Sequence, residues 1–332
     1  MDSDRSRLDL CFNGGTALVS TGDGVIRVYK AHPERPYSNA VPTLVLMHGA
    51  GLFSAASFAL VARQLRNACH VVAYDCRGHG DSPLPPSGEC TTAALVRDAL
   101  AVCVFAVGQG AASIILGGHS MGGAIACHVA VRWALSCPLI GLIVLDVAET
   151  RAISGLADSA AALDRVPIAF ESLDDAVQWV TANNIIRLRA SAEVSLPHAL
   201  ALDSDTKLWT WRAAAFMAKS RADWRGWFEG VDDAFLTFRG PRLLIAPGPD
   251  CLDATLLRAQ MRGAYEFVVI PEAGHVLHED APDRVAAAVL TFLRRFLPLD
   301  DVLAARLARA RAARDALSAT TSCGAGRKCA DA

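Results

Sequence analysis

The stretch from Ser113 to Val131, SIILGGHSMGGAIACHVAV, constrains the fold of this chain more than any other segment. An apolar run, a G-x-S-x-G turn around Ser120 and a segment of small and apolar residues follow directly on one another. This order is typical of a strand, a sharp turn and a helix, where glycines keep strand and helix from clashing. The turn would hold the Ser120 hydroxyl at the tip of a sheet, with the Met121 amide facing a developing oxyanion. A glycine-rich turn that merely contains a serine is the alternative, and the flanking patterns argue against it.

A second strand and turn come earlier in the chain. The apolar segment Thr43–Met47 runs directly into the sequence H-G-A-G at residues 48–51. Glycines in such a turn let backbone amides approach a substrate oxygen closely. We therefore assign a second oxyanion donor to the Ala50 amide, with the Gly51 amide as the alternative; an ordinary strand-to-helix connection is the weaker interpretation.

A serine hydroxyl is a poor nucleophile unless a base and an orienting carboxylate lie nearby. His275 is the candidate base, because it follows the last predicted strand on a short turn at the same sheet edge as Ser120. Two carboxylates, Asp146 and Asp250, each follow a strand and keep the chain order serine, aspartate, histidine. Residue patterns alone leave this choice open, although the position of Asp250 is the commoner one for the orienting acid in enzymes of this build. The predicted reaction is acyl transfer to water from an ester, thioester or amide.

Apolar runs and helical patterns alternate through most of the chain, with short connections between them. This alternation predicts an α/β fold, with a mostly parallel central sheet and helices on both faces. The expected helices are Ala56–Asn67, Thr91–Val107, the segment after Ser120 and Ala281–Phe296. The expected strands are Thr16–Ser20, Val25–Lys30, Thr43–Met47, Cys69–Asp75, Ile114–Leu116, Leu139–Leu145, Arg242–Ala246 and Tyr265–Ile270.

The pattern changes between Glu149 and Phe238, where strand runs disappear and helical periodicity takes over. We interpret residues 149–238 as a helical cap inserted into one domain, residues 1–298. Residues 1–15 are expected to be a ragged terminus, and residues 299–332 a frayed or disordered tail. Four tryptophans lie close together in the cap and are expected to form mostly its core, with a minority facing a cleft: Trp209, Trp211, Trp224 and Trp227.

Composition excludes several classes of function. The formal net charge of -2 offers no electrostatic case for nucleic acid or an anionic membrane surface. The longest apolar run, Ala99–Val107, is too short to cross a bilayer. The 10 cysteines form no C-x-x-C pair, which favours reduced thiols in a cytosolic or nuclear protein, and the first residues do not resemble a secretory signal. We expect no metal and no cofactor.

Segments beyond the catalytic motifs match one known family, and together they extend over roughly residues 24–296. The chain closely resembles the protein phosphatase methylesterase 1 family, a family of α/β hydrolases. The cap tryptophans and the H-E-D-A-P-D run carry more specificity than the motifs that many α/β hydrolases share. The matching segments are Arg27–Lys30, His48–Gly51, Gly118–Ala126, Leu145–Val147 with Glu149, Gln178–Trp179, Trp211–Arg212, Trp224–Phe228, Gln260–Met261, Gly274–His275 and His278–Asp283.

This resemblance implies an α/β-hydrolase fold and a concrete reaction. The family removes the methyl ester from the C-terminal leucine of the protein phosphatase 2A catalytic subunit, releasing methanol, and binds that phosphatase directly. The resemblance also implies Asp146 as the triad acid, with Asp250 as the alternative. We expect Gly51, Trp211 and His278 to contact the substrate.

Two departures from the family pattern stand out, and two other functions compete with the family's. Ala50 replaces the third residue of the family's H-G-G-G, and the acidic cap insertion of some members is not apparent between residues 199 and 209. A general small-molecule carboxylesterase and a phosphatase-binding inhibitor with incidental catalysis are the alternative functions.

Overall fold

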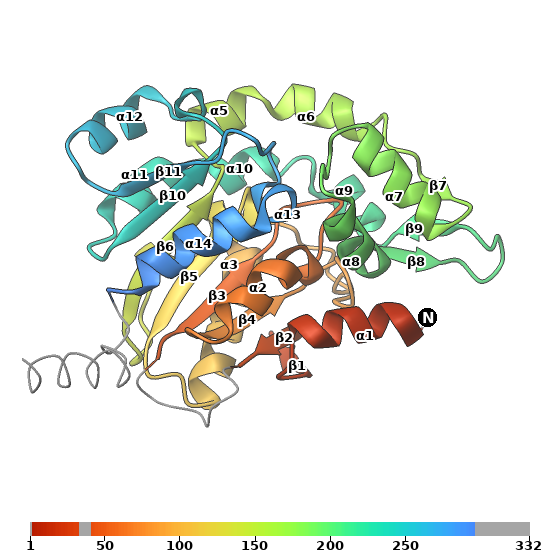
Figure 1. The fold of residues 1–332 in the computed structure, drawn as a ribbon, viewed down its shortest axis with the longest axis horizontal. Helices are drawn as coiled ribbons and strands as arrows, with labels where there is room; N and C mark the ends of the chain where they lie inside the picture. The colour runs from red at the N-terminus through yellow and green to blue at the C-terminus, as the bar shows by residue number, and fades with distance from the viewer. Residues whose placement is uncertain (1, 33–40, 296–332) are drawn as a thin grey trace, which may run out of the picture. The chain divides into compact units, whose positions relative to one another are not determined.

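An eight-stranded sheet forms the centre of the protein in the computed structural model, which describes residues 2–32 and 41–295 (Figure 1). The tail predicted for residues 299–332 lies outside the described residues. In spatial order the sheet contains β1 (Thr16–Ser20), β2 (Val25–Ala31), β4 (His70–Tyr74), β3 (Thr43–Met47), β5 (Ile114–His119), β6 (Leu139–Leu145), β10 (Arg242–Ala246) and β11 (Glu266–Val269).

The strand directions follow from how the strands are connected. From β4 to β11 every neighbouring pair is parallel, because a helix-containing crossover separates the strands along the chain. The β1–β2 hairpin and the β2–β4 pair are antiparallel. Every residue of β3, β4 and β5 is buried, as expected for parallel strands covered on both faces. The predicted mostly parallel sheet is confirmed, and the strand boundaries differ from the prediction by only a few residues.

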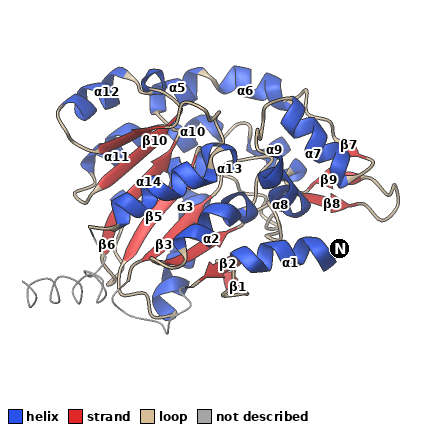
Figure 2. Cartoon of the chain, in the orientation of Figure 1, coloured by secondary structure: helices blue, strands red, loops and turns tan. Residues whose placement is uncertain are grey.

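Helices cover both faces of this sheet (Figures 1 and 2). Helices α2 and α14 pack against each other in front of the sheet as drawn, and α3 packs against α4. The helices outside the cap are α1 (Asp2–Cys11), η1 (Ala55–Phe58), α2 (Ala59–Leu65), α3 (Thr92–Gly108), α4 (Met121–Val131), η2 (Pro249–Cys251), α12 (Ala254–Met261), α13 (Leu277–Asp280) and α14 (Pro282–Leu293).

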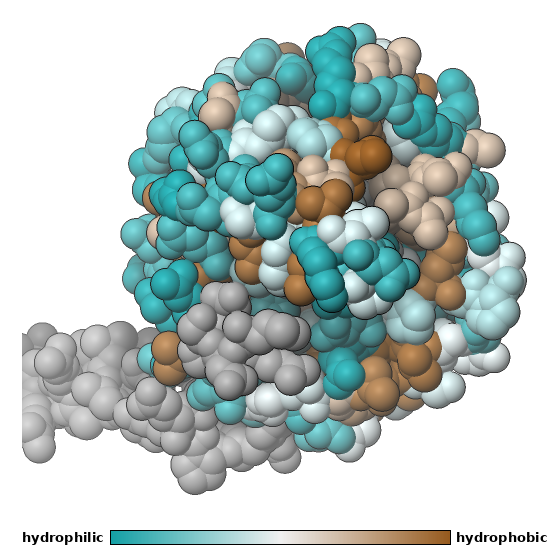
Figure 3. Space-filling view, turned by 90° about the vertical axis from the view of Figure 1, so that its right-hand side faces the viewer, coloured by the Kyte–Doolittle hydropathy of each residue, from teal (hydrophilic) through white to brown (hydrophobic). Residues whose placement is uncertain are grey.

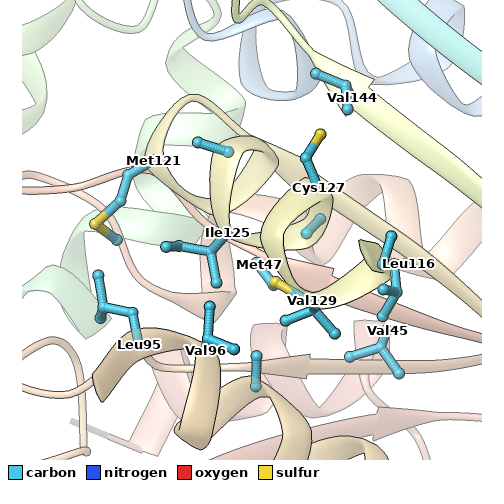
Figure 4. Close-up of a cluster of buried hydrophobic side chains, with 14 of the residues drawn as sticks. Val45, Met47, Leu95, Val96, Leu116, Met121, Ile125, Cys127, Val129 and Val144 are labelled. Carbon is cyan, nitrogen blue, oxygen red and sulfur yellow. The ribbon is translucent and has the colours of Figure 1, made fainter. Parts of the chain in front are cut away.

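Helix α4 packs directly on the centre of the sheet, and this contact fixes the position of the turn before it (Figure 4). Val45 and Leu116 of the strands belong to the same buried cluster as Ile125 and Val129 of α4. Each of these side chains is almost fully removed from water, and burial of one aliphatic side chain contributes roughly 1.5–3 kcal/mol. The helix N-terminus is therefore held at the carboxyl edge of the sheet.

The segment between β6 and β10 lies outside the central sheet and contains seven helices and three short strands. The helices are α5 (Glu149–Ser154), α6 (Leu156–Leu163), α7 (Leu173–Ala182), α8 (Arg189–Ala199), α9 (Ala214–Ser220), α10 (Trp224–Phe228) and α11 (Val231–Thr237). The strands β7 (Ala169–Phe170), β9 (Trp209–Trp211) and β8 (Leu200–Leu202) form an antiparallel sheet in that spatial order. The expectation that strands are absent here is wrong, because strands of two or three residues are too short to produce an alternating pattern.

The N-terminus also differs from the expectation. Residues 2–11 form α1 and not a ragged end, and α1 contacts both α2 and α8. Leu8 and Cys11 of this helix and the following Phe12 are buried. The segment is too polar to show a helical stripe, so its order comes from these tertiary contacts.

Candidate active site

Ser120 occupies a sharp turn between β5 and α4, as the G-x-S-x-G pattern predicts. Its backbone has φ 50° and ψ −120°, a conformation that non-glycine residues rarely adopt. A side chain at Gly118 would overlap the backbone of Gly122, and one at Gly122 would overlap the carbonyl oxygen of Met47. The small residues therefore allow helix and strand to approach closely enough to form the strained turn.

Asp146 follows β6, the strand next to β5, and its backbone is also left-handed, with φ 47°. Its amide donates to the Ile245 carbonyl at 2.8 Å. One carboxylate oxygen, Oδ2, lies 2.6 Å from Nδ1 of His275. Asp250 lies in η2, where its backbone carbonyl accepts a hydrogen bond from Arg151. The structure therefore pairs His275 with Asp146.

His275 lies in the loop between β11 and α13, and about half of its side chain is exposed to solvent. Its carbonyl oxygen lies 2.9 Å from Nε2 of His119, the residue before Ser120. The His119 ring is fully buried between the rings of Phe53, His275 and His278. Because burial lowers the pKa of His119 well below its usual value, its ring is neutral and Nε2–H can donate to the His275 carbonyl.

The backbone amides of Met121 and Ala50 are the expected oxyanion donors. Met121 is the first residue of α4, so its amide has no acceptor within the helix. Ala50 and Met121 both line a cavity that also contains Ser120 and His275. The Gly51 amide donates to Nε2 of His79 at 3.0 Å, which removes Gly51 as the alternative donor.

The buried ring of His79 stabilises the loop that carries Ala50. Burial lowers the pKa of His79 to about 4, so the ring is neutral at physiological pH. Its Nδ1 lies 3.0 Å from the Arg77 carbonyl, which identifies Nδ1 as the donor and Nε2 as the acceptor for Gly51. Gly51 has φ 88°, a conformation that glycine adopts without strain. The loop is therefore held in one conformation beside Ser120.

Ser120 and His275 lie at the junction of two cavities. The first, here called the polar cavity, has a volume of about 330 Å³ and is lined by the charged residues Asp146, Arg151 and Asp158. The second, called the apolar cavity, has a volume of about 370 Å³. Its apolar lining comes mostly from the cap and includes Leu52, Phe53, Leu156, Leu163, Val166, Ile185, Met217, Trp224, Trp227 and Phe228.

A third cavity, called the cap cavity, has a volume of about 260 Å³ and shares Leu163, Met217 and Trp224 with the apolar cavity. Two of the predicted substrate-contacting residues, Gly51 and Trp211, line it. The sequence offered no signal for the lining residues of helices α6 and α9, because apolar cap residues look alike whether they face a core or a cavity.

His278 does not lie where a substrate-contacting residue would. Its side chain is fully buried and stacks on Phe58 with ring centroids 4.3 Å apart. Burial lowers the pKa of His278 to about 3, so this ring stays neutral. It is absent from the lining of all three cavities. The expectation of substrate contact is corrected: three residues in sequence are enough to turn a side chain from the cavity into the core.

No group of three or more histidine, cysteine, aspartate or glutamate side chains within residues 2–32 and 41–295 could hold a metal ion. Within the same residues, no helix is both long and apolar enough to cross a membrane. Eight cysteines of these residues are buried free thiols.

Known proteins resemble this chain in both fold and sequence. The structure of E-2-(acetamidomethylene)succinate hydrolase superposes with a TM-score of 0.68 at 20% identity, covering 84% of this chain and 98% of the other. Because the identity is low, this likeness shows the fold alone. A model of the alpha/beta hydrolase family matches residues 44–288.

Curated relatives match most of the chain at higher identity. Protein phosphatase methylesterase 1 of Gibberella zeae is 35% identical over 86% of this chain and 73% of its own length. The enzymes of the same name from Mus musculus and Schizosaccharomyces pombe are 34% and 36% identical; they cover 83% and 77% of this chain, and 80% and 75% of their own lengths. The chain therefore belongs to the protein phosphatase methylesterase 1 family of α/β hydrolases and is a hydrolase.

Proposed function

We propose that this protein hydrolyses the methyl ester on the C-terminal leucine of the protein phosphatase 2A catalytic subunit and releases methanol. One observation carries the proposal. Asp146 Oδ2 and His275 Nδ1 lie 2.6 Å apart, beside the strained Ser120 turn where the polar and apolar cavities meet. The relatives named protein phosphatase methylesterase 1 support the identity of the substrate.

The proposed mechanism assigns one role to each group. Ser120 Oγ attacks the ester carbonyl carbon while His275 removes the hydroxyl proton, and Asp146 orients the imidazole and stabilises its protonated form. The amides of Ala50 and Met121 donate to the oxyanion of the tetrahedral intermediate. His275 then protonates the departing methanol, and water repeats the sequence to release the free carboxylate and restore Ser120.

The cavities support a polypeptide C-terminus as the substrate. The apolar cavity suits a leucine side chain, and the adjoining cap cavity leads to Ile168, whose side chain is 87% exposed. Figure 3 shows the side of the molecule that carries β7, β8 and β9, where hydrophobic residues lie among hydrophilic ones. Connected cavities that end at the surface favour an extended tail over a small, enclosed ester.

The test is methanol release from methylated protein phosphatase 2A incubated with the wild-type protein or with Ser120→Ala. Wild type should release methanol, and Ser120→Ala should be slower by at least about 10³-fold, because the oxyanion amides alone leave only residual catalysis. An Asp250→Asn variant serves as a matched control for the carboxylate and should retain activity.

Two results would replace this proposal. Cleavage of a small activated ester through Ser120, without demethylation of the phosphatase, would identify a general carboxylesterase. Tight phosphatase binding without cleavage of either substrate would identify an inhibitor.

A further inference from the structure

The loop that carries His275 is held by side chains rather than by the sheet. Residues 270–276 join β11 to α13 and form neither helix nor strand. Ser120 and Asp146, in contrast, directly follow strands. Contacts that fix this loop therefore determine where the His275 imidazole lies relative to the Ser120 hydroxyl.

Asp280, at the end of α13, makes one of these contacts. Its Oδ2 accepts a hydrogen bond from the Gly274 amide at 2.7 Å, and Gly274 directly precedes His275. Its Oδ1 accepts a hydrogen bond from the Arg187 amide, also at 2.7 Å. Only 1% of the Asp280 side chain is exposed, so water does not compete for these bonds. One buried carboxylate thus joins the catalytic loop to the cap.

Arg187 adds a second link from the same cap segment, the connection between α7 and α8. Its Nη1 donates to the Glu272 carbonyl at 2.8 Å, and its Nε lies 3.8 Å from Asp280 Oδ2. A side chain at Gly274 would lie 3.2 Å from both Arg187 Nη2 and Asp280 Oδ2. The guanidinium and the carboxylate therefore enclose the backbone immediately before His275.

Helix α8 anchors the α13 turn independently of Arg187. The hydroxyls of Ser191 and Ser195 donate to the backbone carbonyl and to Oε2 of Glu279, both at 2.6 Å. Glu279 is 1% exposed and is the neighbour of Asp280. Asp280 therefore contacts the segment just before α8, and its neighbour Glu279 contacts α8 itself. A movement of this part of the cap would displace the loop of His275.

We propose that Asp280 and Arg187, here called the loop latch, are positioning residues that hold His275 in reach of Ser120. Neither side chain touches the reacting atoms; both act through the backbone at Glu272–Gly274. The latch links the cap to the catalytic histidine, so that cap geometry sets the reactivity of Ser120. This inference rests on the proposed function only in taking His275 as the base for Ser120.

The test uses Asp280→Asn, which keeps the size of the side chain but cannot accept hydrogen bonds on both of its terminal atoms. Two measurements are made: kcat/KM for p-nitrophenyl acetate, and the rate and endpoint of Ser120 labelling by a fluorophosphonate. Both rates should fall about 10- to 100-fold, because small misplacements of catalytic groups cost that much. The labelling endpoint should remain one fluorophosphonate per chain, whereas misfolding would lower this number.

Arg187→Met tests the second half of the latch. Its rates should fall about three- to tenfold, less than for Asp280→Asn, because the backbone amide of residue 187 still reaches Asp280. In Arg187→Met/Asp280→Asn the two effects should be less than additive, since both substitutions release the same loop.

Two control variants test whether the losses are specific to the latch or follow from removing any charged side chain in this region. Asp283→Asn removes a carboxylate three residues from Asp280 that accepts from Gln64. Arg189→Met removes a cap arginine that pairs with Asp174 and Glu193. Both should stay within about twofold of wild type, as surface substitutions usually do.

Three results would overturn the latch. They are wild-type labelling rates in Asp280→Asn, a labelling endpoint that falls in step with the rate, and equal losses in the two controls. Ser120→Ala distinguishes failure of the latch from failure of the proposed function. If that variant still cleaves the ester at the wild-type rate, the serine mechanism is wrong; if it is inactive while Asp280→Asn is normal, only the latch is wrong.

Discussion

Two regions of the candidate active site are built in different ways. Ser120 and Asp146 directly follow adjacent parallel strands, and their backbone amides bond to the carbonyls of Leu145 and Ile245. Both have left-handed backbones, with φ values of 50° and 47°, that the surrounding sheet maintains. His275 lies in a loop that depends on side chains from the cap, from α13 and from β5. Strand ends thus supply rigidity, and the loop supplies the part of the site that can be adjusted.

Asp146→Asn should produce the largest effect on activity. An asparagine would preserve the packing at the end of β6 but favour the wrong tautomer of His275, so kcat/KM should fall by about 10⁴-fold. Steady-state hydrolysis of p-nitrophenyl acetate measures this change. Asp250→Asn is the control; if its loss were the larger one, the histidine would take its orientation from Asp250 and not from Asp146.

Gly122→Ala tests the rigidity of the strand-end region by its effect on the free energy of unfolding. A Cβ at this position would overlap the Met47 carbonyl, and backbone atoms cannot move aside as a side-chain end can. The free energy of unfolding should fall by about 3 kcal/mol, measured by urea denaturation. Gly226→Ala in α10 is the control, because its Cβ would meet only Thr92 Oγ1 at 3.6 Å. Equal stability of the two variants would show that the strand end can adapt.

Glu279→Gln should change how the free energy of unfolding depends on pH. Burial raises the pKa of Glu279 to about 8 in the folded protein, above its ordinary value of 4.5. Between these values the folded state holds a proton that the unfolded state has lost, so stability falls as pH rises. From pH 6.5 to 8.5 the decrease due to Glu279 should be about 2 kcal/mol.

The measurement is urea denaturation of wild type and Glu279→Gln at several pH values. Burial also raises the pKa of Asp232 to about 8, and this residue contributes a decrease of the same sign. Glu279→Gln should therefore keep the part of the decrease in unfolding free energy with pH that Asp232 causes. Asp232→Asn should keep the part that Glu279 causes. Identical pH profiles for Glu279→Gln and wild type would mean that Glu279 is already ionised at pH 6.5.

His119→Phe should give the smallest effect, on the contact between β5 and the catalytic loop. Phenylalanine fills the space of the buried ring but cannot donate to the His275 carbonyl, and one lost hydrogen bond of about 1–1.5 kcal/mol corresponds to roughly tenfold in kcat/KM. His119→Gln keeps a donor at a similar reach and should recover most of the activity. Equal activity of the two variants would show that packing alone holds the loop on this side.

Local sequence patterns predicted much of the fold and some of the site. The strand positions, the turn at Ser120 and the choice of His275 as the candidate base follow from apolar runs and glycine spacing, which encode backbone structure within a few residues. The cap strands escaped prediction because strands of two or three residues are too short to show an alternating pattern, and α1 did so because its order comes from contacts with the distant helices α2 and α8. The expected substrate contact of His278 is wrong, because helix α13 turns its ring into the core and away from the cavity that His275 lines.

The sequence by itself determined the sheet, the helix behind Ser120 and membership of a hydrolase family. Only the tertiary structure decided between Asp146 and Asp250 on physical grounds, assigned the Gly51 amide to His79 and brought Asp280 and Arg187 together around Gly274. The reason is that backbone patterns depend on near neighbours, whereas each of these contacts joins side chains or amides from different elements. Such contacts exist only after the cap and the sheet have packed against each other.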